Sequence, residues 1–354
     1  MDLDLIKTAT IIEEFGLTKR AITKLEKTGD LIPIKQGRSK FYNKVDLVNF
    51  LNTLDEETLN ELKDSKGVYD PRNKLNDLTG TQWMPETKSY LFQKGLGASH
   101  PHAQIEKQHP APFSFQDIQR LIEFFTKKGD IVLDPFLGVG STLKAAALCD
   151  RNGIGIELSP KWSELARKRL DIEVGEGTSN KYTIINGDSC VELKLLERNS
   201  VDFMVTSPPY WAILNKKADH KVKKERIENE LATNYSDDHQ DLGNIESYDD
   251  FLDILTEDIF KEAAEVLKPE KYMNIVVSDF RHKSEFISFH SDLIQRLNKI
   301  GLADNYELTL QGVKVLLQNH KSLLPYGYPF AYVENIHHQY ILIFRKTKRK
   351  GKKE

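Results

Sequence analysis

The feature that most constrains the fold is a regular alternation of short apolar runs and amphipathic stretches from about residue 109 onward. Buried strands are predicted at 130–134, 153–158, 182–188, 201–207, 272–279, 306–317 and 338–346. Helical periodicity is found at 141–151, 160–171, 251–268 and 286–301. Strands that alternate with helices form mostly parallel sheets with helices on both faces. The pattern therefore predicts an α/β domain with a doubly covered sheet.

Composition sets wider limits on the class of protein. The 354 residues suffice for one large domain and a small one. No apolar run is long enough for a membrane span, and the first residues do not resemble a signal peptide. Two cysteines, Cys149 and Cys190, rule out a disulfide framework and favour the cytoplasm. A net charge of −3 argues against a generally basic nucleic-acid binder but allows a local basic surface.

Residues 1–52 are predicted to form a separate module. Residues 8–31, TATIIEEFGLTKRAITKLEKTGDL, indicate two helices joined at Gly16–Leu17, with Thr18 as the N-cap of the second helix. Two β-prone runs follow around Gly37, and a third helix follows at 45–51. The apolar residues with helical spacing, which would form the shared core, are Ile11, Ile12, Phe15, Leu17, Ile22 and Leu25.

This module resembles a winged helix-turn-helix of the mercury-resistance-regulator or excisionase type. The resemblance implies that the second helix enters a DNA groove and that the wing, with Arg38 and Lys40, contacts phosphate. The alternative is a small helical module that binds another protein.

Three further segments complete the expected organisation. Residues 53–108 are polar and are predicted to be a linker that leads into an ordered arm, where Trp83, Tyr90 and Phe92 need packing partners. The α/β domain is expected at 109–345, followed by a basic tail at 346–354. Within it, 212–247 is too long for an ordinary connection and is interpreted as an insertion that touches DNA. The lysines of its basic half, expected to contact phosphate unless they form only a solvated face, are Lys216, Lys217, Lys221, Lys223 and Lys224.

Acidic residues follow the first three strands of the α/β domain, at the sheet edge where ligands of such folds bind. Asp134 begins DPFLGVGST, a glycine-rich turn into a helix, and Glu157 and Asp188 end the next two strands. Asp134 would repel a pyrophosphate but not a cationic amine or sulfonium. The three acids therefore suit S-adenosyl-L-methionine, although each one alone could be a helix cap or turn residue. The predicted cofactor residues are Asp134, Phe136, Gly138, Gly140, Ser141, Thr142, Glu157 and Asp188.

The fourth strand ends in TSPPYW at 206–211. Pro208 and Pro209 stop sheet pairing and fix the direction of the backbone carbonyls. Tyr210 and Trp211 would then stand at the mouth of the cavity that the strand opens into. A structural proline turn would explain the two prolines but not two aromatic residues beside three acids.

Together these segments resemble the motif series of the exocyclic-amino DNA methyltransferases, which make N4-methylcytosine or N6-methyladenine. The matching segments are DPFLGVGST, GIGIEL, NGDSC and TSPPYW, with 109–125 and 324–346 resembling the family's flanking regions. The resemblance spans about residues 75–345 and implies a Rossmann-like methyltransferase fold, with Phe113 at the cofactor. In this chain the cofactor half precedes the catalytic half, the reverse of the commonest order for S-P-P-Y members. His338 stands where the family often has a glutamate.

The resemblance explains TSPPYW as catalytic. The lone pair of a base amine is delocalised into the ring, and acceptors for its N–H groups favour a pyramidal, reactive nitrogen. Ser207 Oγ and the Pro208 carbonyl are the expected acceptors, Pro209 helps to hold that carbonyl, and Tyr210 is expected to stack on a flipped base. This chemistry needs no metal. Methylation at cytosine C5 would need a thiolate, for which Cys149 and Cys190 are poorly placed.

The sequence thus predicts a methyltransferase acting on double-stranded DNA, with N4-methylcytosine as the favoured product and N6-methyladenine as the alternative. A cognate restriction endonuclease is a candidate partner. Rival hypotheses are an RNA or protein methyltransferase and an inactive DNA-binding regulator. The intact Asp134, Glu157 and Ser207-to-Tyr210 segment argues against the regulator.

Overall fold

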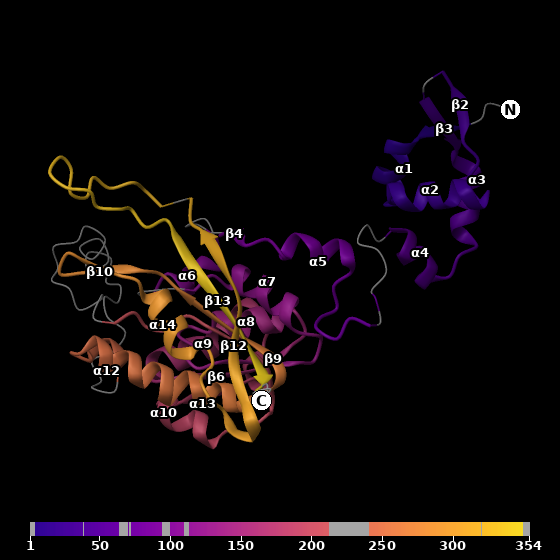
Figure 1. The fold of residues 1–354 in the computed structure, drawn as a ribbon. Helices are drawn as coiled ribbons and strands as arrows, with labels where there is room; N and C mark the ends of the chain where they lie inside the picture. Colours follow the sequence, from indigo (N-terminus) through magenta and orange to yellow (C-terminus); the bar gives the residue numbers. More distant parts are fainter. Residues whose placement is uncertain are drawn as a thin grey trace, which may run out of the picture. The chain divides into compact units, whose positions relative to one another are not determined.

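The structure, a computed structural model, divides into two compact units. It describes residues 4–37, 39–63, 70, 72–93, 100–109, 113–211, 241–319 and 321–349. One unit contains residues up to 74 together with 78–87, and the other contains 75–77 together with the chain from 88 onward (Figure 1). The predicted DNA-contact residues Arg38, Lys216, Lys217, Lys221, Lys223 and Lys224 lie outside the described residues.

The N-terminal unit combines helices with a small sheet of order β1-β3-β2, antiparallel throughout. Its elements are β1 (Leu5–Lys7), α1 (Thr8–Phe15), α2 (Lys19–Thr28), β2 (Ile34–Gln36), β3 (Ser39–Asn43), α3 (Lys44–Asn52), α4 (Glu56–Lys63) and α5 (Gly80–Glu86). The predicted turn and cap are confirmed, because Gly16 ends α1 with a φ of 70° and the Thr18 side chain accepts from the Ala21 N–H. Strand β1 was not predicted.

The core of this unit contains the predicted apolar residues. Ile11, Leu17, Ile22 and Leu25 are buried, and Ile12 and Phe15 pack against them in part. The unit extends past residue 52, where the sequence placed its boundary. Helix α4 belongs to it, because Leu62 is buried in the same core and its carbonyl accepts from the Thr18 N–H at 3.2 Å.

The larger unit is built on a sheet of eight strands in the order β4-β12-β13-β9-β8-β5-β6-β7. The strands are β4 (Tyr90–Phe92), β5 (Ile131–Asp134), β6 (Asn152–Glu157), β7 (Thr183–Asn186), β8 (Val201–Thr206), β9 (Leu267–Val277), β12 (Tyr306–Leu317) and β13 (His338–Lys348). Only β13 runs antiparallel to its neighbours in this sheet. The predicted mostly parallel sheet is confirmed, and the carboxyl ends of its other strands share one edge.

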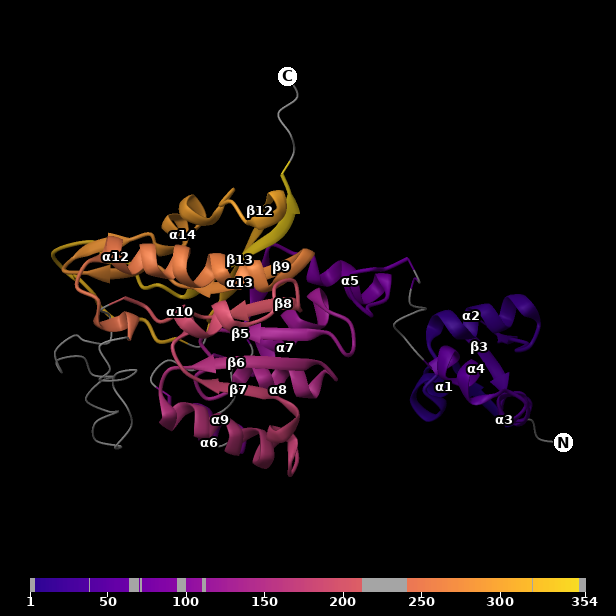
Figure 2. The same ribbon diagram turned by 90° about the horizontal axis from the view of Figure 1, so that it is seen from below.

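Helices cover both faces of this sheet, as Figure 2 shows. They are α6 (Ala103–Glu106), α7 (Phe115–Phe125), α8 (Ser141–Leu148), α9 (Pro160–Glu173), α10 (Ser189–Glu192), α12 (Tyr248–Asp253), α13 (Lys261–Val266) and α14 (Phe289–Leu297). Side chains of α7 and α8 pack with Val132 and Phe203 on one face. Those of α12, α13 and α14 pack with Leu133 and Met204 on the other. Successive side chains along each strand point to opposite faces of the sheet, so these strands contribute to two separate cores.

Two predicted helices differ in detail from the structure. The stretch 251–268 contains a π-helical segment, η4 (Ile254–Phe260), between α12 and α13, and it passes into β9 at Leu267. The stretch 286–301 begins as β11 (Glu285–Ile287), which pairs with β10 (Phe280–His282), before α14 starts at Phe289. Hairpin pairing and strand extension override helical periodicity at these ends.

The ends of the predicted linker and tail also differ. Leu91 of β4 is buried, whereas Tyr90 and Phe92 are 43% and 52% exposed and pack edge-on against each other with ring centroids 5.7 Å apart. Strand β13 continues through Lys348, so 346–348 are strand and not tail. Lys346 is fully buried, because its Nζ atom donates to Asn199 Oδ1 and to the carbonyls of Glu265 and Leu267. Across the described ranges, no helix has the length and apolar character of a membrane span.

Candidate active site

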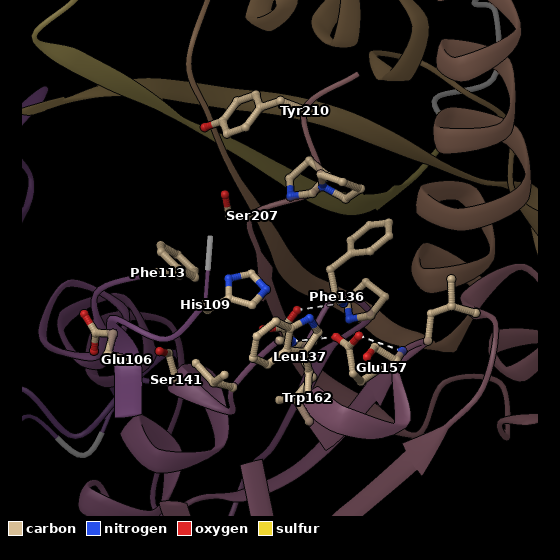
Figure 3. Close-up of a pocket in the computed structure, with 18 of the residues that line it drawn as sticks. Glu106, His109, Phe113, Phe136, Leu137, Ser141, Glu157, Trp162, Ser207 and Tyr210 are labelled. Carbon is tan, nitrogen blue, oxygen red and sulfur yellow. Dashed lines mark hydrogen bonds between the residues drawn. The ribbon is translucent and has the colours of Figure 1, made fainter. Parts of the chain in front are cut away.

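A pocket of about 660 Å³ opens at the sheet edge where the parallel strands end. Figure 3 shows Ser207 and Tyr210 on one side of it and Glu157 and Trp162 on the other. The predicted site residues that line it are Phe113, Asp134, Phe136, Gly138, Ser141, Glu157, Asp188, Ser207, Pro208, Pro209 and Tyr210. The sequence therefore identified residues that the fold brings to one cavity from four different strand ends.

Two predicted cofactor residues do not line the pocket. Thr142 is fully buried, and its hydroxyl donates a hydrogen bond to Asp134 Oδ2. Gly140 has a φ of 78°, and a Cβ atom there would lie 2.9 Å from the Cβ of Ala166 on α9. Glycine at this position permits close packing of the loop on α9, not approach of a ligand.

Asp134 is buried and bonded to its own protein scaffold. Its Oδ1 atom accepts from the Phe136 N–H at 3.0 Å and from Thr206 Oγ1, and its Oδ2 atom accepts from Thr142. Burial raises the pKa of this carboxyl group, and the three hydrogen bonds oppose that rise. Asp134 thus ties the loop after β5 to α8 and to the end of β8, and it also lines the pocket, where the sequence predicted a cofactor residue.

Glu157 is held by two backbone donors at the end of β6. Its Oε2 atom accepts from the Gly138 N–H at 2.8 Å and its Oε1 atom from the Ser159 N–H at 2.9 Å. Burial raises the pKa of Glu157 to about 7; the two hydrogen bonds act against this rise, and the charges of Asp134 and Asp241 add to it. The carboxylate is fixed in direction, with lone pairs left for a ligand's hydroxyl groups.

Asp188 has both of the roles that the sequence allowed. It is the N-cap of α10, where its Oδ1 atom accepts from the Cys190 N–H at 2.9 Å, and it also lines the pocket. The neighbouring Cys190 and the distant Cys149 are not thiolates, because burial raises the pKa of each thiol to about 12. Neither provides the nucleophile that methylation at cytosine C5 requires.

The loop after β8 is fixed by Tyr210. Its hydroxyl accepts from Gln339 Nε2 at 3.1 Å and is hydrogen-bonded to the Ser207 side chain. Its ring meets Phe280 and Phe289 edge-on. Burial raises the pKa of Tyr210, so the phenol stays protonated.

Trp211, in contrast, is not at the mouth of the cavity as predicted. It is buried, it donates Nε1–H to the Ile245 carbonyl at 2.8 Å, and its ring packs against Tyr248. Trp211 therefore anchors the end of the loop after β8.

Three glutamines line the pocket beside Tyr210 and were missed by the sequence interpretation. Gln318 Nε2 donates to Gln93 Oε1 at 3.0 Å and lies 3.3 Å from Gln339 Oε1. Gln318 Oε1 is buried and has no hydrogen-bond partner within the described ranges. Gln93 follows β4 and Gln318 follows β12, so the same strand-end argument that found the acids would have found both.

The pocket wall beneath the loop after β5 also contains residues that were not predicted. His109 packs on Trp162 with ring centroids 5.1 Å apart, and both line the pocket. The fully buried Arg169 donates to Glu106 Oε2 at 2.7 Å and to Ser141 Oγ at 2.8 Å. This ion pair joins α6, α8 and α9 below the loop. No spacing in the sequence signals these contacts, which depend on the packing of three helices.

Two other sets of charged or metal-binding side chains bear on the predictions: the predicted DNA-contact lysine and any cluster that could hold a metal. Lys40, the predicted DNA-contact residue that is described, has its Nζ atom 2.9 Å from both carboxylate oxygens of Glu26. Among the residues that the structure places, no three His, Cys, Asp or Glu side chains gather as a metal site would require.

Comparison with known proteins adds a family and several relatives. A family model described as DNA methylase, N6_N4_Mtase, matches residues 10–168 and 201–354. Type II methyltransferase M.BglI of Bacillus subtilis is 37% identical over 100 residues, 28% of this chain and 26% of that protein. Type II methyltransferase M2.DpnII of Streptococcus pneumoniae is 39% identical over 108 residues, 30% of this chain and 36% of that protein. The aligned part thus spans about a quarter to a third of the length of these relatives.

Solved structures with a related arrangement include TrmN from Thermus thermophilus. The TM-score is 0.41 with 17% identity, covering 72% of this chain and 54% of that chain. For a SAM-dependent O-methyltransferase from Thermotoga maritima the TM-score is 0.35 with 14% identity, covering 67% of this chain and 66% of that chain.

Proposed function

Because the chain belongs to the N6_N4_Mtase family of DNA methylases, we propose that it methylates an exocyclic amino group of a base in double-stranded DNA, using S-adenosyl-L-methionine. The favoured product is N4-methylcytosine, since the serine form of the S-P-P-Y motif resembles that subgroup. One observation supports the proposal above all: Ser207 and Tyr210 line the same pocket as Asp134, Glu157 and Asp188.

The residues of the pocket fit this cofactor. The acids favour a cationic ligand over a phosphate, and Glu157 presents a fixed carboxylate to a ribose diol. Phe136 and Trp162 offer apolar surface for an adenine ring, and Lys107 offers a cation for the carboxylate of the methionine part. When bound, S-adenosyl-L-methionine would supply an electrophilic methyl group: the amine lone pair forms the N–C bond, the S–C bond breaks to leave neutral sulfur, and the methylated nitrogen releases one N–H proton to solvent.

The loop after β8 prepares the amine for that step. The Tyr210 oxygen can accept a hydrogen bond from the Ser207 hydroxyl, which leaves the lone pairs of Ser207 Oγ free to accept from an amine N–H. The Pro208 carbonyl accepts the second N–H, and Pro209 limits its rotation. Both contacts favour a pyramidal nitrogen with an available lone pair.

The three glutamines would hold the edge of the target base. The buried Gln318 Oε1, which has no partner among the residues that the structure describes, needs a donor, and a flipped base supplies N–H groups in this pocket. Gln93 and Gln339 fix the Gln318 amide so that its oxygen, and not its nitrogen, is available.

The N-terminal unit is proposed to act as a winged helix-turn-helix that adds DNA affinity. Helices α1 and α2 and the β2–β3 hairpin have the order that this role needs. Lys40 must then exchange Glu26 for phosphate, and Arg38 and the lysines at 216–224 would add contacts of the same kind. Since relatives carry the name Type II methyltransferase, we include a restriction endonuclease as a proposed partner.

The decisive experiment is transfer of labelled methyl groups to duplex DNA, followed by nucleoside analysis and by sequencing of native DNA with modification detection. The expected label is in N4-methylcytosine. Label in N6-methyladenine would keep the mechanism and change the base. Label in 5-methylcytosine, RNA or protein would contradict the proposal.

A further inference from the structure

The loop between β12 and β13 presents large apolar side chains to solvent. Tyr328, Phe330 and Tyr332 are 80%, 94% and 83% exposed, and Leu323 is 76% exposed. Figure 1 shows this yellow loop extending well beyond the sheet. Single exposed apolar residues are common on protein surfaces, but a cluster of this kind marks a surface that meets a partner.

The loop is an ordered turn and not a loose connection. Gly327 has a φ of 71°, and its carbonyl accepts from the N–H groups of Phe330 and Ala331, both at 2.7 Å. The Asn335 side chain closes the loop, because its Oδ1 and Nδ2 atoms bond the N–H and the carbonyl of Leu324, each at 2.9 Å. Backbone and amide hydrogen bonds therefore fix the shape, and they hold the aromatic rings outward.

The base of the loop is part of the pocket. The Gln318 N–H donates to the His337 carbonyl at 2.8 Å and so joins the two stems. Gln318, Lys321 and Gln339 line the pocket, and Gln339 also donates to the Tyr210 hydroxyl. The aromatic tip is therefore continuous with the wall that holds Tyr210.

We propose that this loop is a wedge that opens the duplex: its aromatic rings stack on bases beside the target while the target base occupies the pocket. The inference rests on the proposed function. A base in a duplex cannot reach such a pocket without unstacking, which costs a few kcal/mol. Aromatic side chains offset this cost by stacking on the neighbouring bases, and such stacking does not depend on the DNA sequence.

Position favours DNA over a second copy of this chain as the occupant. The stems of the loop are pocket wall, so a protein partner seated there would compete with the substrate for the entrance. The rim lysine Lys321 also suits a polyanion, and the single carboxylate of the loop is Glu334. Tyrosine and phenylalanine are the side chains that stack best on bases while leaving an edge in water.

The test compares two forms of one substrate. Amplified bacterial genomic DNA, which carries no methyl groups, is used as duplex and after heat denaturation, with labelled S-adenosyl-L-methionine and the full-length protein. The variants are Tyr328→Ala, Phe330→Ala and the conservative Phe330→Tyr. Leu195→Ala, at an equally exposed apolar residue outside the pocket, is the matched control.

We expect Tyr328→Ala and Phe330→Ala to lower the rate on duplex about tenfold or more, and the rate on single strands less than about twofold. Phe330→Tyr keeps the ring and should stay within about twofold of wild type on both forms. Cofactor affinity by calorimetry should not change.

Equal losses on both forms of DNA, or no loss on duplex, would overturn the wedge and leave the proposed function standing. A shift from dimer to monomer on gel filtration in the alanine variants would assign the loop to a second copy instead. A wild-type protein that methylates neither form would overturn the proposed function and this inference with it.

Discussion

The two sides of the pocket are built from different chemistry. On the side of β5, β6 and β7 stand the carboxylates of Asp134, Glu157 and Asp188, each of which accepts from backbone N–H groups of the strand-end loops. On the side of β4, β12 and β13 stand the neutral amides of Gln93, Gln318 and Gln339, which bond to one another and to the Tyr210 hydroxyl of the loop after β8. We name these the acid side and the amide side.

The difference indicates what each side can recognise. Carboxylates with most of their hydrogen bonds already made provide charge and fixed direction, which suits one constant, cationic ligand. Amides provide both donors and acceptors at low desolvation cost, which suits the edge of a neutral base. One cavity thus carries two binding chemistries that substitutions should separate.

The largest expected effect is on the acid side. Asp134→Ala removes the acceptor of three buried donors, so the free energy of unfolding should fall by about 3–5 kcal/mol, and cofactor binding should fall with it. Urea unfolding measures the first and calorimetry the second. Asp188→Ala is the matched control, because it loses one helix cap and should cost only about 1 kcal/mol of stability. Equal losses in the two variants would refute the scaffold role of Asp134.

Ser207→Ala should separate the two sides most clearly. Loss of one acceptor for the amine should lower kcat about a hundredfold, while the Kd for the cofactor changes less than about twofold. Single-turnover methyl transfer and calorimetry give the two numbers. Ser141→Ala, at a serine of the acid side, should instead weaken cofactor binding more than it lowers kcat. The same response in both variants would remove the distinction between the sides.

Gln318→Ala should act on DNA alone. Loss of its Oε1 acceptor and of two amide contacts should raise KM for DNA about tenfold without changing the Kd of the cofactor. Gln311→Ala, at an exposed glutamine of the same strand, is the control and should behave as wild type. A changed cofactor Kd in Gln318→Ala would argue against a separate amide side.

The smallest expected effect is a pH dependence of the acid side. With a pKa of about 7, Glu157 is mostly ionised at pH 8 and mostly protonated at pH 6. Cofactor affinity should therefore fall about tenfold when the pH is lowered from 8 to 6. Glu157→Gln should bind more weakly and lose this dependence. Calorimetry across this range is the measurement, and a steep dependence retained in Glu157→Gln would assign the titration to another group.

The same group affects stability with the opposite sign. The pKa of Glu157 is about 7 in the folded protein and 4.5 in the unfolded chain, so the folded protein binds this proton more tightly. The contribution to stability is therefore present below pH 4.5 and is lost as the pH rises to about 7.

The sequence predicted the acid side better than the amide side, and the reason is physical. The glycine-rich turn and the strand-end acids are local signals, so Asp134 and Glu157 could be placed from their neighbours in the chain. The two prolines placed Ser207, outside the acid side, in the same way. Gln318 follows a predicted strand and could have been found by the same argument, but Gln339 lies within β13 and carries no local signal. His109 and Arg169 depend on helix packing that no periodicity encodes. Trp211 was misplaced because an aromatic residue after a proline turn gives no sign of which way it faces.

Strand β4 has a consequence for anyone who shortens this chain. Among the residues that the structure describes, it pairs only with Val315, Leu316 and Leu317 of β12, which is 12 residues long and is the next strand at this margin of the sheet. A fragment starting at residue 109 would lack β4 and would bare those backbone groups. An uncovered strand end of Val and Leu can pair between molecules, so such a fragment should aggregate, whereas one starting at Leu75 should stay dispersed.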